Sequence, residues 1–135
     1  MPDNSAVSYA KKISRILFVD DDVLTLDLMS KAVRLLGHEP IVCASGNAAI
    51  RQARENRPDL IMVDLVLSDT TGYHLIEDLH AQKETAHIPV VLVTAGTGPN
   101  DEKMARQAGA SGFLVKPLVL SDLARVIQQF TPVVS

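Results

Sequence analysis

Five short, almost continuously apolar runs recur along the chain, and each is followed by a longer segment with helical periodicity. The runs span residues 16–19, 40–43, 60–63, 90–93 and 112–115. A strand that helices cover on both faces lacks the polar alternation of a half-exposed strand, so this pattern favours a parallel sheet. Right-handed crossovers then place helices on both faces. We therefore expect an α/β fold with a doubly wound, five-stranded parallel sheet and five helices.

The predicted helices are defined by apolar residues at helical spacing and by start and stop signals around them. Gly37 follows the first helix as a C-terminal stop, Asn47 is expected to cap the second helix, and Pro58 ends it. Gly109 and Pro132 end the fourth and fifth helices. The predicted apolar faces consist of Leu24, Leu28, Ala32 and Leu35; Ala49, Ile50 and Ala53; Leu75, Ile76 and Leu79; Met104, Ala105 and Ala108; and Leu123, Val126, Ile127 and Phe130.

Length and composition indicate a single domain. Of the 135 residues, 47% are apolar and 21% are charged, which is enough apolar volume for a packed core. We predict a domain over residues 15–131. A flexible arm at 1–14 precedes it, and a short tail at 132–135 follows it.

Charge and cysteine content exclude several classes of function. The formal net charge of −3, with both signs interspersed, argues against direct binding of nucleic acid through a basic face. The single Cys43 excludes an internal disulfide and a cysteine-built zinc site, and fits a reducing cytoplasm. No apolar stretch approaches the roughly 20 residues of a membrane-spanning helix, and the N-terminus lacks a secretory signal pattern. We therefore expect a cytoplasmic protein with no membrane contact.

Polar residues follow four of the five predicted strands. The first strand is followed by 20–22, which are three aspartates, the third by Asp64, the fourth by Thr94 and the fifth by Lys116. In doubly wound sheets the functional crevice lies at the carboxyl ends of the strands, so these side chains should meet at one rim. Clustered carboxylates repel one another unless a proton or a cation neutralises them. An all-oxygen site of this kind suits Mg²⁺.

Each of these residues also has a purely structural interpretation. An aspartate after a strand is often a turn former, and Asp22 is expected to cap the following helix. Lys116, taken alone, is typical of a surface lysine. Asp64 is harder to explain in this way, because it interrupts an apolar run in which a buried charge is costly. The combination of these residues at four strand ends favours a functional site.

With these motifs the sequence resembles the receiver domains of two-component response regulators, over residues 15–130. The matching motifs are the acidic pair Asp20-Asp21, Asp64 within the run 59–65, Thr94-Ala95, and the segment 108–117, which ends in Lys116-Pro117. Four motifs in this order are highly specific. The resemblance implies a flavodoxin-like sheet with strand order 2-1-3-4-5.

The resemblance also implies a role for each site residue. Asp64 would accept a phosphoryl group from a phosphohistidine of a histidine kinase or phosphotransfer protein. Asp21, Asp64 and the main-chain carbonyl of Val66 would bind Mg²⁺, and Asp20 would hold a coordinating water. The phosphoryl oxygens would be bound by three groups, namely the Lys116 ammonium, the Thr94 hydroxyl and the Ala95 amide. Lys116-Pro117 is often a cis peptide in this family.

Signalling in this family couples Thr94 to an aromatic ring on the fifth strand, which is Phe113 here. The ring has no hydroxyl, although Tyr is more usual, so any switch would depend on packing. The face that would change consists of the fourth helix, fifth strand and fifth helix, and it would bind a downstream protein target, an effector domain or a second copy of the chain. The domain would be a signalling module that catalyses only its own phosphotransfer and dephosphorylation.

The sequence departs from the family pattern in the loop after Asp64. Ser68 stands where proline is common, which is expected to loosen the loop, and Thr71 replaces an aspartate but can still cap the third helix.

Three other functions fit the sequence less well than a phosphorylated receiver. A degenerate receiver would bind a partner without phosphate, but the full set of site residues argues against it. A flavodoxin-like cofactor binder would need a phosphate loop where three aspartates stand. An aspartyl hydrolase would need an aspartate at Val66.

Overall fold

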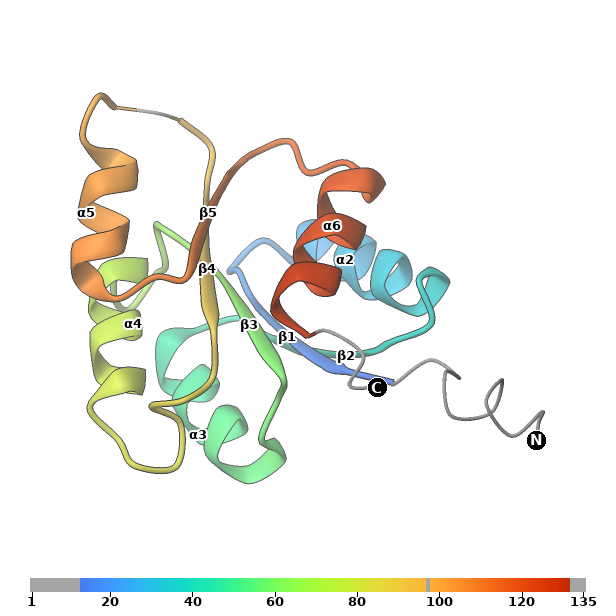
Figure 1. Ribbon diagram of the computed structural model, residues 1–135, viewed down its shortest axis with the longest axis horizontal. Coiled ribbons are helices and arrows are strands. Elements are labelled where there is room, and N and C mark those ends of the chain that lie inside the picture. The colour runs from blue at the N-terminus through green and yellow to red at the C-terminus, as the bar shows by residue number, and fades with distance from the viewer. Residues whose placement is uncertain (1–12, 97, 132–135) are drawn as a thin grey trace, which may run out of the picture.

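The computed structural model describes residues 13–96 and 98–131 and contains five strands alternating with five helices (Figure 1). The predicted arm and tail therefore lie largely outside the described residues. Ser14, at the end of the predicted arm, is buried, and its carbonyl accepts a hydrogen bond from the Glu39 N–H at 2.9 Å. The elements are β1 (Arg15–Val19), α2 (Val23–Leu35), β2 (Glu39–Cys43), α3 (Gly46–Asn56), β3 (Leu60–Asp64), α4 (Gly72–His80), β4 (Val90–Thr94), α5 (Asp101–Ala108), β5 (Gly112–Val115) and α6 (Leu120–Phe130).

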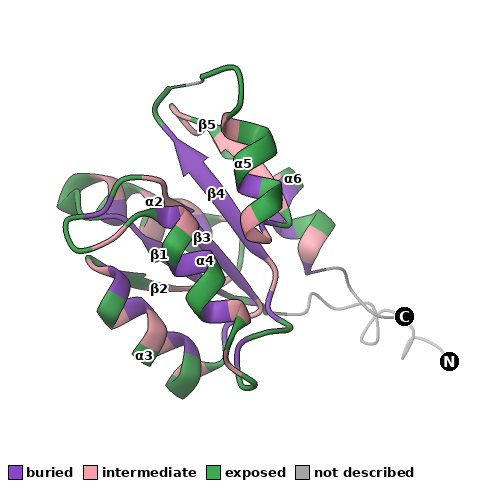
Figure 2. Ribbon diagram, turned by 90° about the vertical axis from the view of Figure 1, so that its left-hand side faces the viewer, coloured by how far each residue is buried: buried purple, intermediate pink, exposed green. Residues whose placement is uncertain are grey.

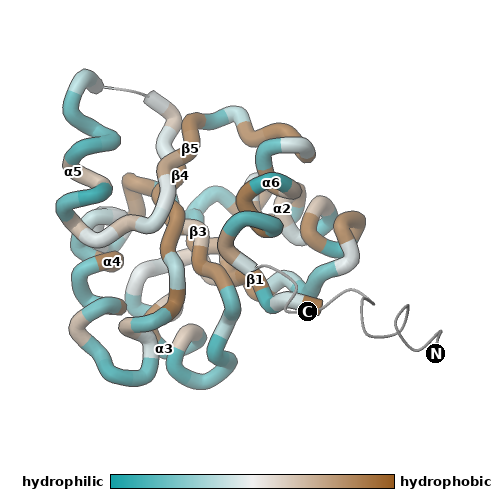
Figure 3. The backbone as a smooth tube through the Cα atoms, in the orientation of Figure 1, coloured by the Kyte–Doolittle hydropathy of each residue, from teal (hydrophilic) through white to brown (hydrophobic). Residues whose placement is uncertain are grey.

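All strands are parallel, in the order β2-β1-β3-β4-β5, which confirms the predicted fold class. The three central strands β1, β3 and β4 are buried along nearly their whole length (Figure 2) and are largely hydrophobic (Figure 3). This is the pattern expected where helices cover both faces of a sheet. The edge strand β5 is only partly buried.

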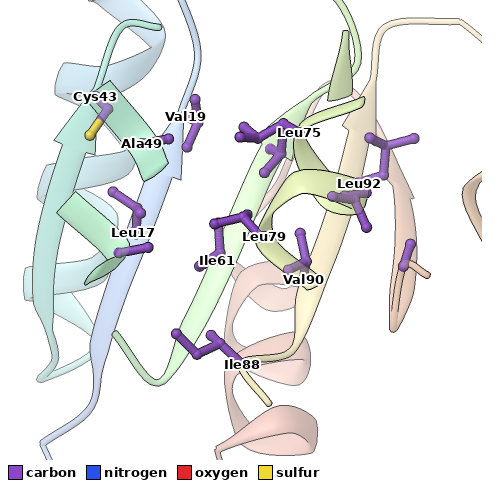
Figure 4. Packing of buried hydrophobic residues seen from close by; sticks show 14 of the residues in the cluster. Leu17, Val19, Cys43, Ala49, Ile61, Leu75, Leu79, Ile88, Val90 and Leu92 are labelled. Carbon is purple, nitrogen blue, oxygen red and sulfur yellow. The ribbon is translucent and has the colours of Figure 1, made fainter. Parts of the chain in front are cut away.

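Two hydrophobic layers hold the helices to the sheet. On one face, α3, α4 and α5 pack on side chains such as Leu17, Ile61 and Leu92 (Figure 4). On the other face, α2 and α6 pack on Ile16 and Met62. The two groups of helices stand on opposite sides of the sheet in Figure 1. Because side chains of successive strand residues point to opposite faces, each strand contributes to both layers.

The apolar face predicted for α2 is wrong. Leu24, Leu28 and Leu35 are 71%, 59% and 74% exposed, whereas Leu26 and Val33 are buried against the sheet. The sequence of α2 contains apolar residues on two overlapping stripes, and periodicity alone could not distinguish them. The stripe that packs on the sheet includes Leu26, Met29, Val33 and Leu36. Ala32 belongs to the predicted face and is partly buried there.

Helix ends follow the predicted signals with two corrections. Gly37 and Gly109 have φ angles of 88° and 108°, the left-handed conformation of a helix stop. Ser45, not Asn47, caps α3, and its hydroxyl accepts a hydrogen bond from the Ala48 N–H. Asp22 occupies the N-cap position of α2 but makes no side-chain capping hydrogen bond, and its carboxylate accepts one from the Thr25 hydroxyl at 2.6 Å.

Among the described residues, no helix is both long enough and apolar enough to cross a lipid bilayer.

Candidate functional site

Three carboxylates meet at the carboxyl ends of β1 and β3. The two strands are paired in register, with Val19 opposite Val63, so Asp20, Asp21 and Asp64 follow them at the same edge of the sheet. One oxygen from each carboxylate lies within 4.8 Å of the others. Asp20 is buried, Asp64 is partly buried and Asp21 is exposed. The predicted acidic cluster is therefore present, and it is open to solvent on the Asp21 side.

Lys116 reaches this cluster from the end of β5. Its Nζ lies 2.8 Å from Oδ2 of Asp20 and 3.7 Å from Oδ1 of Asp64. The Lys116-Pro117 peptide bond is cis, and the Lys116 N–H donates to the Thr94 carbonyl at 2.7 Å. Partial burial lowers the pKa of the ammonium, but the hydrogen bond and charge of Asp20, aided by the charge of Asp64, outweigh burial, so the pKa lies above its ordinary value.

The pKa of the Asp64 carboxyl lies above its ordinary value. Burial raises the pKa of its carboxyl, the charges of Asp20 and Asp21 raise it further, and the Lys116 ammonium offsets only part of this. Three carboxylates and one ammonium leave this cluster with excess negative charge. The donor set is made of hard oxygens, and Asp21 is exposed on one side, so the residues fit a divalent cation such as Mg²⁺.

Thr94 and Ala95 lie at the carboxyl end of β4, next to the cluster. Thr94 is buried, and its hydroxyl donates to the Gly96 carbonyl at 3.1 Å. Ala95 is exposed. Because β4 pairs in register with β3, with Val93 opposite Asp64, both residues stand on the rim that carries the carboxylates. The structure thus brings the predicted hydroxyl and amide to the same edge of the sheet.

Phe113 and Val66 are the other two residues singled out from the sequence. Phe113, on β5, is partly buried and packs against the layer under α3, α4 and α5. It pairs with Leu92 of β4, two residues before Thr94. Val66 is 69% exposed in the loop between β3 and α4 and forms an isolated antiparallel bridge with Thr71.

The loop at 65–71, which we call the acceptor loop because it follows Asp64, is closed by backbone hydrogen bonds. The Gly72 N–H donates to the Leu65 carbonyl at 2.7 Å, and the Leu67 N–H donates to the Thr70 carbonyl at 3.1 Å. Thr71 caps α4 through the His74 N–H, as predicted.

Asp69, at the tip of the acceptor loop, was missed by the sequence reasoning. Its Oδ1 accepts a hydrogen bond from the Gly46 N–H at 2.9 Å, and its Oδ2 accepts one from the Asn47 N–H at 3.0 Å. These backbone hydrogen bonds lower the pKa of the Asp69 carboxyl. The only local signal was an aspartate in a turn-rich stretch, which does not reveal a partner 23 residues away.

Comparison with known proteins agrees with this fold and site. The family model described as the response regulator receiver domain matches residues 16–128. The chain therefore belongs to the family of receiver domains found in two-component response regulators. Receiver domains are signalling domains.

Individual relatives lie at moderate sequence distance. The polar-differentiation response regulator DivK of Brucella ovis is 32% identical over 115 residues, which cover 85% of this chain and 94% of that protein. Among solved structures, the chemotaxis protein CheY4 of Vibrio cholerae has a TM-score of 0.83 at 26% identity, covering 88% of this chain and 99% of CheY4. The receiver domain of the sensor histidine kinase PA1611 from Pseudomonas aeruginosa has a TM-score of 0.81 at 28% identity, covering 88% and 98% of the two chains, and holds a magnesium ion in its active site cleft.

Proposed function

We propose that this protein is a phosphorylatable receiver in which Asp64 accepts a phosphoryl group from a phosphohistidine of a histidine kinase or phosphotransfer protein. The observation that carries the proposal is the position of the Lys116 Nζ, which lies 2.8 Å from Asp20 and 3.7 Å from Asp64 within a cluster of three carboxylates. A structural ion pair would need one carboxylate. The excess of carboxylates beside one ammonium suits a site that takes up both a cation and a phosphoryl group.

The chemistry of the transfer is a displacement at phosphorus. One carboxylate oxygen of Asp64 forms a bond to phosphorus while the phosphorus–nitrogen bond of the donor breaks. The electron pair of that bond returns to the imidazole nitrogen, and the donor ring, protonated on its other nitrogen, leaves as neutral imidazole. The product is an acyl phosphate on Asp64, a covalent intermediate of the carboxylate-nucleophile type.

Mg²⁺ would be held by Asp21, Asp64 and the Val66 carbonyl, with Asp20 binding a coordinating water. When bound, the ion neutralises negative charge on the carboxylates and on the phosphoryl oxygens. Lys116 would bind one phosphoryl oxygen as a point charge, since its ammonium already lies at this rim. The Thr94 hydroxyl and the Ala95 N–H would bind another.

Signal output would pass from Thr94 to the face formed by α5, β5 and α6. The Thr94 hydroxyl now donates to Gly96, and its turn toward a phosphoryl oxygen would change the packing beside Phe113. Phe113 faces the same layer as α5, so a movement of the ring would alter that face. A downstream protein target, an effector domain or a second copy of the chain would recognise the altered face.

The test is phosphate uptake from a small donor, followed by intact-mass spectrometry. With phosphoramidate and Mg²⁺, the wild-type protein should gain the mass of one phosphoryl group, and it should gain none after chelation of the metal. Asp64→Asn should take up no phosphate. Asp22→Asn is the matched control, because Asp22 is a neighbouring carboxylate whose side chain is bound to Thr25 outside the cluster.

If Asp22→Asn and the wild type both stay unmodified, the proposal is wrong, and a receiver that binds its partner without phosphate takes its place. Phosphate uptake by Asp64→Asn at the wild-type level would show that a residue other than Asp64 accepts the phosphoryl group.

A further inference from the structure

We propose that Asp69 is a positioning residue whose carboxylate ties the tip of the acceptor loop to the first turn of α3 and so fixes the Val66 carbonyl at the metal site. The inference deepens the proposed function and rests on it. Asp69 itself is not one of the three clustered carboxylates, and its own carboxylate is already engaged by two backbone N–H groups.

The first observation is the architecture of the loop. Its base is closed by the hydrogen bond from the Gly72 N–H to the Leu65 carbonyl and its middle by the hydrogen bond from the Leu67 N–H to the Thr70 carbonyl, and together these two bonds form the bridge between Val66 and Thr71. The segment thus leaves and returns like a narrow hairpin, with Asp69 at its tip. The buried Leu67 side chain anchors one arm of this hairpin in the hydrophobic layer under α3 and α4, whereas the exposed Asp69 side of the tip depends on its contacts with α3.

The second observation is the tight contact between the tip and α3. A Cβ added to Gly46 would lie 2.5 Å from Cγ2 of Thr70, which is closer than such atoms approach. The Thr70 side chain therefore rests directly on the backbone of α3, and a larger residue at position 46 would force that side chain to move. The two hydrogen bonds of Asp69 are made at the same place, to the N–H groups of Gly46 and Asn47.

The third observation concerns the acceptors that bind the N–H groups in the first turn of α3. Negative charge at the first turn of a helix is favourable, because unpaired N–H groups point outward there. Helix α3 already has its own cap, since the Ser45 hydroxyl accepts from the Ala48 N–H at 3.2 Å. Asp69 therefore adds a second acceptor from outside the helix. What distinguishes this second acceptor is that it belongs to the acceptor loop.

Ser45→Ala is consequently a matched control for Asp69→Ala. Both substitutions remove a side-chain acceptor from the first turn of α3, and both should lower stability by a similar small amount. Only Asp69→Ala releases the acceptor loop. Asp69→Asn keeps one carbonyl oxygen and should give an intermediate result.

The first readout is Mg²⁺ affinity, measured by NMR titration of the folded proteins with the metal alone. Loss of a group that orients a metal ligand commonly costs tenfold or more in affinity, so Asp69→Ala should bind Mg²⁺ about tenfold more weakly than the wild type. Ser45→Ala should bind it as the wild type does. If Asp69→Ala and Ser45→Ala bind Mg²⁺ equally well, the inference is overturned.

The second readout does not need the metal. Amide hydrogen exchange at Leu67 and Gly72 should be faster in Asp69→Ala than in the wild type and unchanged in Ser45→Ala, because these two N–H groups close the loop. Unchanged exchange in Asp69→Ala would refute the inference even if the wild type bound no Mg²⁺. Absence of Mg²⁺ binding and of phosphate uptake in the wild type, combined with faster exchange in Asp69→Ala, would instead overturn the proposed function and confine Asp69 to shaping the loop.

Discussion

Two loops border the candidate site, and they are built in different ways. The acceptor loop after β3 is closed by backbone hydrogen bonds and tied to α3 by Asp69. In the loop between β4 and α5, all described residues from Ala95 to Asn100 are exposed. Its side-chain hydrogen bonds run from the Thr94 hydroxyl to the Gly96 carbonyl and from the Gly98 N–H to the Asp101 carboxylate. The acceptor loop is held in one conformation by its hydrogen bonds, whereas the exposed loop after β4 has few contacts that would oppose a change of conformation. This division suits a site in which Asp64 must stay aligned while Thr94 moves.

Two glycines express the same difference, namely Gly72, the first residue of α4 directly after the acceptor loop, and Gly96 in the loop after β4, and exchanging them for alanine should give the largest effect. In Gly72→Ala the new Cβ would lie 2.5 Å from Cδ1 of Leu92 and 2.8 Å from the Asp64 carbonyl oxygen. Overpacking against backbone should cost about 3 kcal/mol of unfolding free energy. In Gly96→Ala no atom lies within 4 Å of the added Cβ, so the change should stay within about 0.5 kcal/mol.

Urea denaturation of the two variants beside the wild type measures both values. Equal urea midpoints for Gly72→Ala and Gly96→Ala would show that both sites accommodate an added Cβ equally well. The contrast between the two loops would then be wrong.

The helix caps that follow the two loops should differ next. Thr71 caps α4 through the His74 N–H, whereas Asn100, before α5, makes no side-chain cap hydrogen bond. Thr71→Ala should therefore lower the unfolding free energy by about 1 kcal/mol, and Asn100→Ala should change it by only a few tenths. Thermal unfolding followed by circular dichroism would measure both. A larger loss in Asn100→Ala than in Thr71→Ala would contradict the assignment of the caps.

The smallest effect should come from removing the charge of Asp64, the residue that directly precedes the acceptor loop. The raised pKa of Asp64 means that the folded state binds this proton more tightly than the unfolded chain does, so the Asp64 contribution to stability is largest below the ordinary pKa and is lost as pH rises through the raised value. Asp64→Asn should therefore be more stable than the wild type at pH 7, by roughly 1 kcal/mol or less. The gain should shrink as pH falls toward 4.

Denaturation of the wild type and Asp64→Asn over this pH range, in the absence of divalent cations, checks the sign. A loss of stability in Asp64→Asn at pH 7 would mean that the attraction of Lys116 outweighs burial and the repulsion of Asp20 and Asp21.

Much of the fold could be predicted because its determinants are local. Continuous apolar runs mark the strands to within about one residue, and glycine stops end α2 and α5 where the sequence indicates. The buried face of α2 could not be predicted, because two apolar stripes compete on that helix and only the position of the sheet selects one. The α3 cap was misplaced by two residues, because Ser45 and Asn47 are both good capping residues.

The acidic cluster could be predicted because parallel topology brings strand ends together, whatever the intervening sequence. Asp20, Asp21, Asp64 and Lys116 meet for this reason. Their roles, and that of the Val66 carbonyl, stay predictions until phosphate uptake is measured. The contact of Asp69 with α3 follows from loop shape, which depends on packing between segments that are distant in sequence. No sequence pattern within either segment predicts this contact between Asp69 and α3.

The close approach of Thr70 to Gly46 has a consequence for how such sequences can vary. A side chain at position 46 would require another rotamer of Thr70, a smaller residue at position 70, or a different course of the chain between Leu65 and Thr71. Substitutions at positions 46 and 70 should therefore be coupled among natural homologues. A chimera that received the segment 65–71 without a glycine at position 46 should inherit its residues but not its conformation.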